Sequence, residues 1–149
     1  MNGVLIQTEV VVCAYMTGVI WLIQLVHYPS FFFVEGTRFR EFSILHQNRM
    51  GFIVGGPMLV ELFTACYSLF FDQSFLIILA MILLAIIWYV TFFVSVPLHS
   101  KLSRGWDEVS CKRLVQTNWW RTMGWSLRLV ILLVQYNLAL NMKRGLLID

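Results

Sequence analysis

Three histidines are the residues of this chain best suited to carry chemistry: His27, His46 and His99. Neutral imidazole is the commonest metal ligand in proteins, and three protein nitrogens with an open position suit catalytic zinc or non-haem iron. No two of these histidines have the close H-x-x-x-H spacing of one helix face. The cofactor is therefore unknown, and four interpretations stay open. They are a metal ion on all three histidines, a haem on His27 and His99, acid–base catalysis without a metal, and histidines that only cap helix ends.

Two sets of polar residues repeat one spacing along the chain. The members are His27, His46 and Arg49 in the first half and His99, Asn118 and Arg121 in the second, so each set occupies positions i, i+19 and i+22. A single offset of 72 in the numbering relates the two sets, which predicts an internal duplication. A duplicated helix–connection–helix unit would bring all six candidate catalytic residues to one end of the molecule. There the arginines, with their fixed fork of donors, would hold an anionic or oxygenated group.

The composition indicates which kind of protein would hold these residues. Of 149 residues, 59% are hydrophobic and only 13% are charged, which excludes a disordered chain and is too apolar for a soluble domain of this length. Three cysteines exclude a disulfide scaffold. A net charge of +3, without a basic run among aromatics, gives no reason to expect a nucleic-acid partner. We therefore expect one integral membrane domain over residues 1–149, with the lipid bilayer as its surroundings.

Four stretches are long and apolar enough to cross a bilayer as helices: 5–27, 50–71, 75–97 and 118–140. The sequence thus predicts an all-α transmembrane four-helix bundle. The first span should end near Pro29, and Gly55, Gly56 and Pro57 should kink the second. Only residues 72–74 separate the second and third spans. The two longer connections show apolar residues at helical spacing, so we expect two amphipathic segments lying at the membrane surface.

Two residues of opposite charge lie deep inside the spans, where an ionisable group is costly and usually faces the interior of the bundle. Glu61 follows Met50 by about three helical turns, and Arg128 follows Asn118 by nearly the same length of helix. Both are therefore roughly 15 Å deep, at a rise of about 1.5 Å for each residue. The equal depth predicts a structural ion pair between spans two and four, while a proton-handling or ligand-binding role for Glu61 is the alternative.

Three tryptophans, Trp119, Trp120 and Trp125, lie where the fourth span enters the membrane. Tryptophan is enriched at membrane interfaces, so we expect all three to act as interfacial anchors. Stacking of one ring over an aromatic ligand is the alternative.

The distribution of lysine and arginine predicts the orientation of the chain in the membrane. Seven basic residues fall in the two long connections: Arg38, Arg40, Arg49, Lys101, Arg104, Lys112 and Arg113. On the other side only Lys143 and Arg144 are basic. Because basic loops stay in the cytoplasm, we expect both long connections to be cytoplasmic and both termini to be extracytoplasmic.

The C-terminal half resembles a known family. The segments PLHSKL at 97–102 and NWWRT at 118–122 resemble motifs of the small four-span membrane proteins grouped with anthrone oxygenases, a family mostly of unknown function. The first half resembles that family only in its four-span plan, and His99 stands where the family pattern has asparagine. The resemblance implies oxygenation of a polycyclic phenol-like substrate in a membrane-embedded pocket, with Asn118 and Arg121 as site residues.

These observations together predict a membrane-embedded oxidoreductase or oxygenase-like protein that binds a small apolar or aromatic molecule. The pocket would be lined by histidine and arginine near the cytoplasmic face. The alternative is a non-catalytic membrane subunit or scaffold that packs against a partner or forms a homo-oligomer, so whether the chain is an enzyme stays open. A cavity lined by His27, His46, His99 and Arg121 would favour the enzyme or ligand binder, and a filled interior would favour the scaffold.

Overall fold

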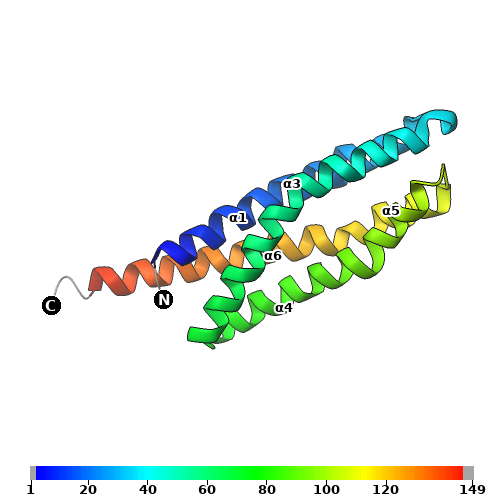
Figure 1. Cartoon of the computed structure of the whole chain (residues 1–149). Coiled ribbons are helices and arrows are strands. Elements are labelled where there is room, and N and C mark those ends of the chain that lie inside the picture. Colours follow the sequence, from blue (N-terminus) through cyan, green and yellow to red (C-terminus); the bar gives the residue numbers. More distant parts are fainter. Residues whose placement is uncertain (1–2, 146–149) are drawn as a thin grey trace.

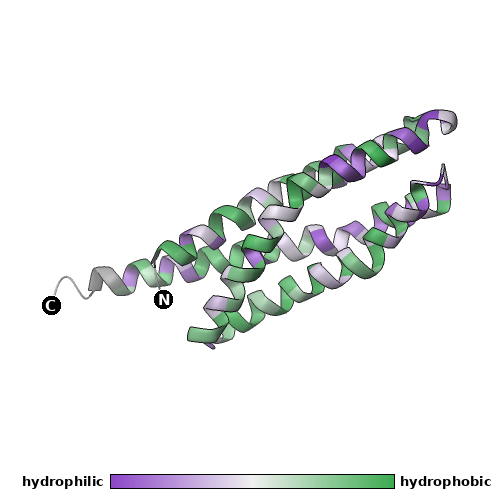
Figure 2. Cartoon of the chain, viewed as in Figure 1, coloured by the Kyte–Doolittle hydropathy of each residue, from purple (hydrophilic) through white to green (hydrophobic). Residues whose placement is uncertain are grey.

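The computed structural model describes residues 3–145, and within them the chain is helical apart from short connections (Figure 1). The elements are α1 (Gly3–Leu22), η1 (Ile23–His27), α2 (Tyr28–Ser30), η2 (Phe31–Phe33), α3 (Gly36–Phe71), α4 (Phe75–Val90), η3 (Thr91–Ser95), α5 (Val96–Leu102) and α6 (Glu108–Gly145). They form four rods long and apolar enough to cross a membrane. Figure 2 shows apolar residues along all four rods. The protein is an integral membrane four-helix bundle.

Helix α6 is the centre of the bundle. It packs extensively against both α1 and α4, whereas α3 contacts α1 along one part of its length and α4 along another. Figure 1 shows the two ends of the chain at the same end of the bundle as the turn between α3 and α4. In that turn the Ser74 N–H donates to Asp72 Oδ1 at 3.0 Å. The connections at 34–35 and 103–107 lie at the opposite end.

The first connection expected to lie separately on the membrane surface is helical from Gly36, and the second is helical from Glu108, after a turn at 103–107. Both helical parts continue without a break into the following spans. Helices α3 and α6 have 36 and 38 residues, or about 54 and 57 Å at 1.5 Å per residue, against about 30 Å of hydrocarbon. Neither 37–50 nor 109–123 contains a glycine or proline that would end the helix. Two apolar side chains of these extensions, Phe39 and Leu114, are fully buried in the bundle.

The first and third rods each change to a π-helical turn just before a proline. Segment η1 (Ile23–His27) precedes Pro29, and η3 (Thr91–Ser95) precedes Pro97. Proline has no N–H and its ring clashes with the carbonyl four residues earlier, and a π turn widens the helix at that point. The first rod therefore does not end near Pro29, as expected, but continues to Phe33.

The π turns bear on the predicted internal repeat, in which His27 would correspond to His99. Helices α3 and α6 start at positions that differ by the repeat offset, whereas the offset between the starts of η1 and η3 is smaller by four. The second half therefore has four extra residues between its proline and its next helix. In the rods themselves His27 corresponds to Ser95, and Phe31 corresponds to His99.

Pro57 lies inside α3, where it cannot donate to the carbonyl of Ile53. The Tyr15 hydroxyl of α1 donates to that carbonyl at 3.4 Å. Figure 1 shows α3 changing direction near its middle, which agrees with the kink expected from Gly55, Gly56 and Pro57. Because of this bend, α3 can contact α1 at one end and α4 at the other.

The start of α6 is fixed outside the spans by Asp107. Its Oδ2 accepts from the Ser110 N–H at 3.1 Å, as an N-cap does, and lies 2.7 Å from Lys101 Nζ. The hydrogen bond from Lys101, together with those from Ser110, holds the pKa of the Asp107 carboxyl below its usual value. The cap links the end of α5 to the start of α6.

The contact between α4 and α6 is closest at Gly124, which gives a test of the packing. A Cβ atom added there would lie 2.9 Å from Cγ1 of the fully buried Ile87. Gly124→Ala should therefore destabilise the bundle by about 1–3 kcal/mol through overpacking, seen as a lower melting temperature of the detergent-purified protein. Gly18→Ala is the control, because nothing lies within 4 Å of a Cβ there and alanine favours the helix. Equal or higher stability of both variants would contradict this packing.

Candidate functional site

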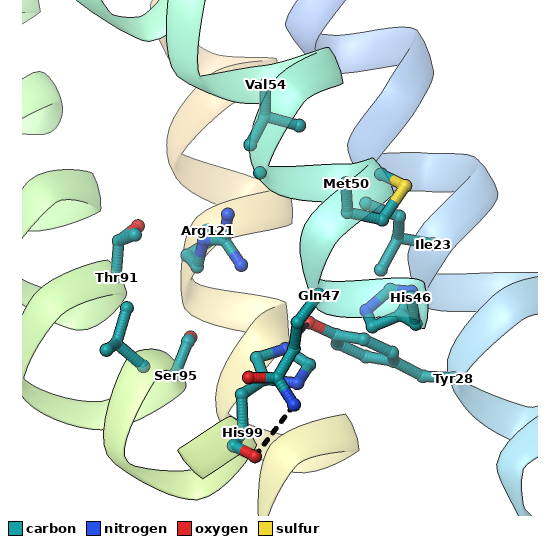
Figure 3. A pocket seen from close by; sticks show the side chains of 12 residues that line it. Ile23, Tyr28, His46, Gln47, Met50, Val54, Thr91, Ser95, His99 and Arg121 are labelled. Carbon is teal, nitrogen blue, oxygen red and sulfur yellow. Dashed lines mark hydrogen bonds between the residues drawn. The ribbon is translucent and has the colours of Figure 1, made fainter. Parts of the chain in front are cut away.

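A cavity of about 230 Å³ lies between α3 and the η3–α5 segment, at the end of the bundle opposite the termini (Figure 3). Its lining residues are Ile23, Tyr28, His46, Gln47, Met50, Gly51, Val54, Thr91, Ser95, Val96, His99 and Arg121. All four rods contribute to it. Apolar side chains form much of the wall, and the polar groups come from different rods.

Arg121 extends into the cavity from α6 and is only 5% exposed. Its Nη1 donates to Asn118 Oδ1 at 3.1 Å. Asn118 Nδ2 in turn donates to Gln24 Oε1 at 2.9 Å, and Gln24 Nε2 donates to the Val115 carbonyl at 3.2 Å. This chain of hydrogen bonds orients the guanidinium from behind. Gln24 is thus a positioning residue that the spacing pattern did not indicate, although it is a polar residue in an otherwise apolar span.

The histidines form a cluster of rings beside Arg121. The rings of His27 and His46 stack with centroids 4.4 Å apart, and Nε2 of His27 faces Nδ1 of His46 at hydrogen-bond distance. The centroids of His46 and His99 are 5.2 Å apart. The Tyr28 hydroxyl lies 3.0 Å from His99 Nε2, and Gln47 Nε2 donates to the His99 carbonyl at 3.0 Å (Figure 3). Tyr28 was not expected at the site; it follows η1 directly, so that turn determines where its ring points.

Five of the six candidate residues gather here, at different distances from the cavity. His46, His99 and Arg121 line it, while His27 lies behind His46 and Asn118 lies behind Arg121. Arg49 does not join them. It is exposed and lines shallow hollows on the outer face of α3. His46 lies at the boundary, because it lines both the cavity and one of these hollows. Arg49 is three residues further along α3, so its side chain is rotated by about 60° around the helix axis from that of His46. This rotation places Arg49 on the outer face.

Three residues that line the cavity each carry a buried polar atom that forms no hydrogen bond within the described part of the chain: Ser95 Oγ, His99 Nδ1 and Arg121 Nε. Buried polar atoms are almost always paired with protein or ordered water, and each exception requires an explanation. The Arg121 Nε–H can only donate. The three residues come from three elements and line one cavity, so together they would suit a bound group that carries a hydrogen-bond acceptor.

The geometry bears on the metal and haem interpretations. Within residues 3–145, no three side chains of His, Cys, Asp or Glu converge in an arrangement that could hold a metal ion. Ring nitrogens of His27 and His46 face each other, and one nitrogen of His99 faces Tyr28. The cavity is also below the 300–1,000 Å³ common for sites of drug-sized ligands. The arrangement therefore fits hydrogen-bonded histidines better than a three-histidine metal centre or a haem.

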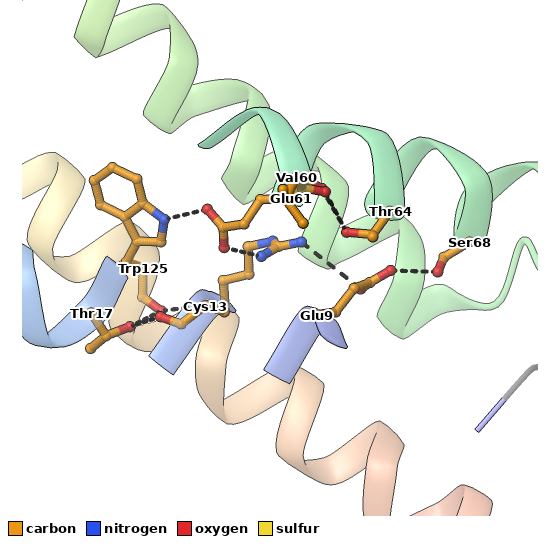
Figure 4. A network of polar contacts seen from close by, with 9 residues as sticks. Glu9, Cys13, Thr17, Val60, Glu61, Thr64, Ser68 and Trp125 are labelled. Carbon is orange, nitrogen blue, oxygen red and sulfur yellow. Dashed lines mark hydrogen bonds and ion pairs between the residues drawn. The ribbon is translucent and has the colours of Figure 1, made fainter. Parts of the chain in front are cut away.

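The ion pair expected from equal depth is present deeper in the bundle (Figure 4). Arg128 Nη1 lies 2.6 Å from Glu61 Oε1, and both side chains are fully buried. Trp125 Nε1 donates to Glu61 Oε2 at 2.8 Å. The pair joins α3 to α6, as expected. A second carboxylate, Glu9 of α1, lies 3.9 Å from Arg128 Nη2 and was missed, because its position just before a long apolar run resembles the start of a span.

The expectation that Trp125 is an interfacial anchor is wrong. Its side chain is fully buried and bonded to Glu61, whereas Trp119 and Trp120 are 41% and 68% exposed. Residue 125 follows Arg121 by one helical turn, so it faces the interior with it. The ring also lies beneath the Arg121 guanidinium, with 5.3 Å between Cζ and the ring centroid.

Comparison with models of protein families, with curated proteins and with solved structures found no match to this chain. The resemblance to the anthrone oxygenase group therefore stays a prediction based on the motifs at 97–102 and 118–122.

The buried ion pair gives a second test. Glu61→Gln should destabilise the bundle, because it removes one charge of a fully buried pair, a change that costs about 3–5 kcal/mol. The loss of stability should be near the lower limit of that range, since Glu9 lies close enough to balance part of the Arg128 charge. Denaturation of the purified protein in detergent measures it. Asp72→Asn is the control, because asparagine keeps the Oδ1 acceptor of the turn; equal stability of both variants would show that the pair contributes nothing.

Proposed function

We propose that this protein is a membrane-embedded oxidoreductase or oxygenase-like protein. Its ligand would be a small apolar or aromatic molecule with one oxygenated or anionic group, bound in the cavity between α3 and α5. The observation that carries the proposal is the set of three buried polar atoms without a hydrogen bond in the described chain, all on residues that line this cavity. Leaving such a group unsatisfied costs about 1–3 kcal/mol. A ligand oxygen among them would remove that cost.

Each polar residue has a role in this proposal. Arg121 and Ser95 would bind the ligand oxygen, and the hydrogen bond from Asn118 keeps Arg121 in place. Tyr28 and His99 lie 3.0 Å apart, within the range needed for proton transfer. They would exchange a proton with the ligand. His46 borders both the cavity and an outer hollow, so His46 and His27 would pass protons between the cavity and the outside.

The rim of the cavity supports a ligand that arrives from the bilayer. Gly51 on α3 and Val96 on α5 are both exposed, and both are apolar. A lipid-soluble molecule could enter between these helices without crossing water. The volume of about 230 Å³ favours a ligand of one or two rings, smaller than the polycyclic substrates that the family resemblance implies.

The same cavity favours a ligand-binding protein over a scaffold. A scaffold would fill its interior with packed side chains, whereas here His46, His99 and Arg121 border an open space. These are three of the four residues expected to line a pocket in a ligand binder, and the fourth, His27, contacts His46.

We also propose that this end of the bundle faces the cytoplasm. The seven basic residues counted in the connections lie toward this end, in the extensions of α3 and α6 and around residues 101–104. On the opposite side are Lys143 and Arg144, whose side chains lie outside the described part. The asymmetry of lysine and arginine in short loops sets orientation.

Binding of 1-naphthol, compared with naphthalene, tests the proposed ligand class. The protein in lipid nanodiscs should bind 1-naphthol more tightly, because the hydroxyl can accept from Arg121 and naphthalene cannot. Arg121→Met should reduce 1-naphthol affinity about tenfold or more, as expected for a hydrogen bond to a charged group, and leave naphthalene affinity nearly unchanged. Tryptophan fluorescence quenching, corrected with empty nanodiscs, measures both.

Arg49→Met is the matched control in that experiment, because Arg49 lies outside the cavity. The thermal stability of both variants is measured first, so that loss of folding is separated from loss of binding. Equal affinity of folded wild type and Arg121→Met for 1-naphthol, or no preference over naphthalene, would refute the proposed polar recognition.

The proposed orientation is tested with a reporter that is active only in the cytoplasm. Fused after residue 149, it should be inactive, and inserted within the connection at 103–107, it should be active. The reverse pattern would refute the orientation without affecting the cavity.

A further inference from the structure

A second polar site lies in the other half of the bundle, away from the cavity. Glu9 of α1, Glu61 of α3 and Arg128 of α6 are 4%, 0% and 0% exposed. Two carboxylates thus face a single guanidinium. With both carboxylates ionised, the cluster would carry one uncompensated negative charge inside the apolar part of the molecule. An isolated buried charge is so costly that the group is normally neutralised instead.

We propose that Glu9 is a proton-binding site, and that its carboxyl group holds a proton while Glu61 and Arg128 stay ionised. With that proton the cluster is neutral overall: one carboxylate balances one guanidinium, and the second carboxyl is uncharged. The ligand is a single proton, which converts the Glu9 carboxylate into a carboxylic acid.

The hydrogen bonds indicate which carboxyl group holds the proton. Glu61 receives donors on both oxygens, from Arg128 Nη1 at 2.6 Å and from Trp125 Nε1 at 2.8 Å. Both bonds stabilise the ionised form. Glu9 is 3.9 Å from Arg128, too far for a hydrogen bond. Its other oxygen contacts Ser68 Oγ at 2.5 Å, and a hydroxyl can accept the Glu9 proton as well as donate its own.

The surroundings of Glu9 favour a proton over a larger ion. A hollow of about 10 Å³ adjoins it, close to the least volume that one water molecule needs. Its lining residues are Glu9, Ala65, Ser68, Ile77, Ala80, Met81, Arg128 and Gln135. The α4 side contributes no ionisable group, and the Cys13 thiol of α1, one turn from Glu9, is the remaining titratable neighbour. Fully buried Arg128 borders this hollow, and its Nε and Nη2 have no hydrogen bond within residues 3–145.

The position of Glu9 gives the proton a short route from solution. Glu9 is six residues from the start of α1, roughly 9 Å at 1.5 Å per residue, and Ser68 is three residues from the end of α3. Both lie toward the end of the bundle that carries the termini (Figure 1). The site would therefore exchange protons with the aqueous phase on that side, independently of the cavity at the opposite end.

Infrared spectroscopy of the protein in nanodiscs at neutral pH tests the proposal directly. The wild type should show the C=O band of a buried carboxylic acid, shifted in D₂O, and Glu9→Gln should abolish it. Glu61→Gln should abolish it as well, because Glu9 would then ionise to balance Arg128. Asp72→Asn, a change outside the cluster, should leave the band intact. The other carboxylates of the described chain, Glu35, Glu41, Asp72, Asp107 and Glu108, are exposed or half-exposed.

Stability distinguishes the proposal from a structural ion pair at Glu9. Glutamine is a close neutral substitute for a protonated glutamate, so Glu9→Gln should keep the wild-type melting temperature while Glu61→Gln lowers it. If Glu9→Gln lowered the melting temperature as much as Glu61→Gln does, Glu9 would be ionised in the wild type, and the proposal would be overturned. A wild-type spectrum without the acid band would also overturn it, as would a stability that depends on added Na⁺ or K⁺ in place of a proton.

Discussion

The interior of this bundle depends on one constraint: a polar group in the hydrocarbon must find its partner within the protein. Helix α6 provides many of these partners. Five of its buried side chains with polar groups are spaced three, four, three and seven residues apart and so lie along one face: Asn118, Arg121, Trp125, Arg128 and Gln135. Gln24 and Glu9 of the first rod and Glu61 of the second lie against this face.

This one face connects two chemically different regions. Toward one end Arg121 borders the cavity, and toward the other Arg128 binds Glu61. Trp125 lies between them and contacts both, through its Nε1 to Glu61 and through its ring to Arg121. A displacement of α6 would therefore change side-chain contacts in both regions. The apolar helices around them keep water away, which strengthens each electrostatic contact.

The sequence indicated how deep each residue lies in the membrane, but it gave much less information about the direction in which each side chain points around its helix axis. Long apolar runs indicated the four spans, and equal depth correctly paired Glu61 with Arg128. Depth also grouped His46, His99 and Arg121 at one end. It could not show that Arg49 turns outward or that Trp125 turns inward, because the direction of a side chain around a helix axis depends on how neighbouring rods pack. Gln24 and Tyr28 were missed for the same reason, because each acts through a partner on another rod.

The π turns before Pro29 and Pro97 make parts of this chain intolerant of changes in length. Each such turn holds one residue more than a regular α-helix, and one residue corresponds to about 100° of rotation. A single-residue deletion within 23–27 would leave the rod apolar and helical, yet it would swing the Tyr28 ring away from His99. The stretches from the prolines to α3 and α6 already differ by four residues between the two halves. The π turns, by contrast, have five residues in each half.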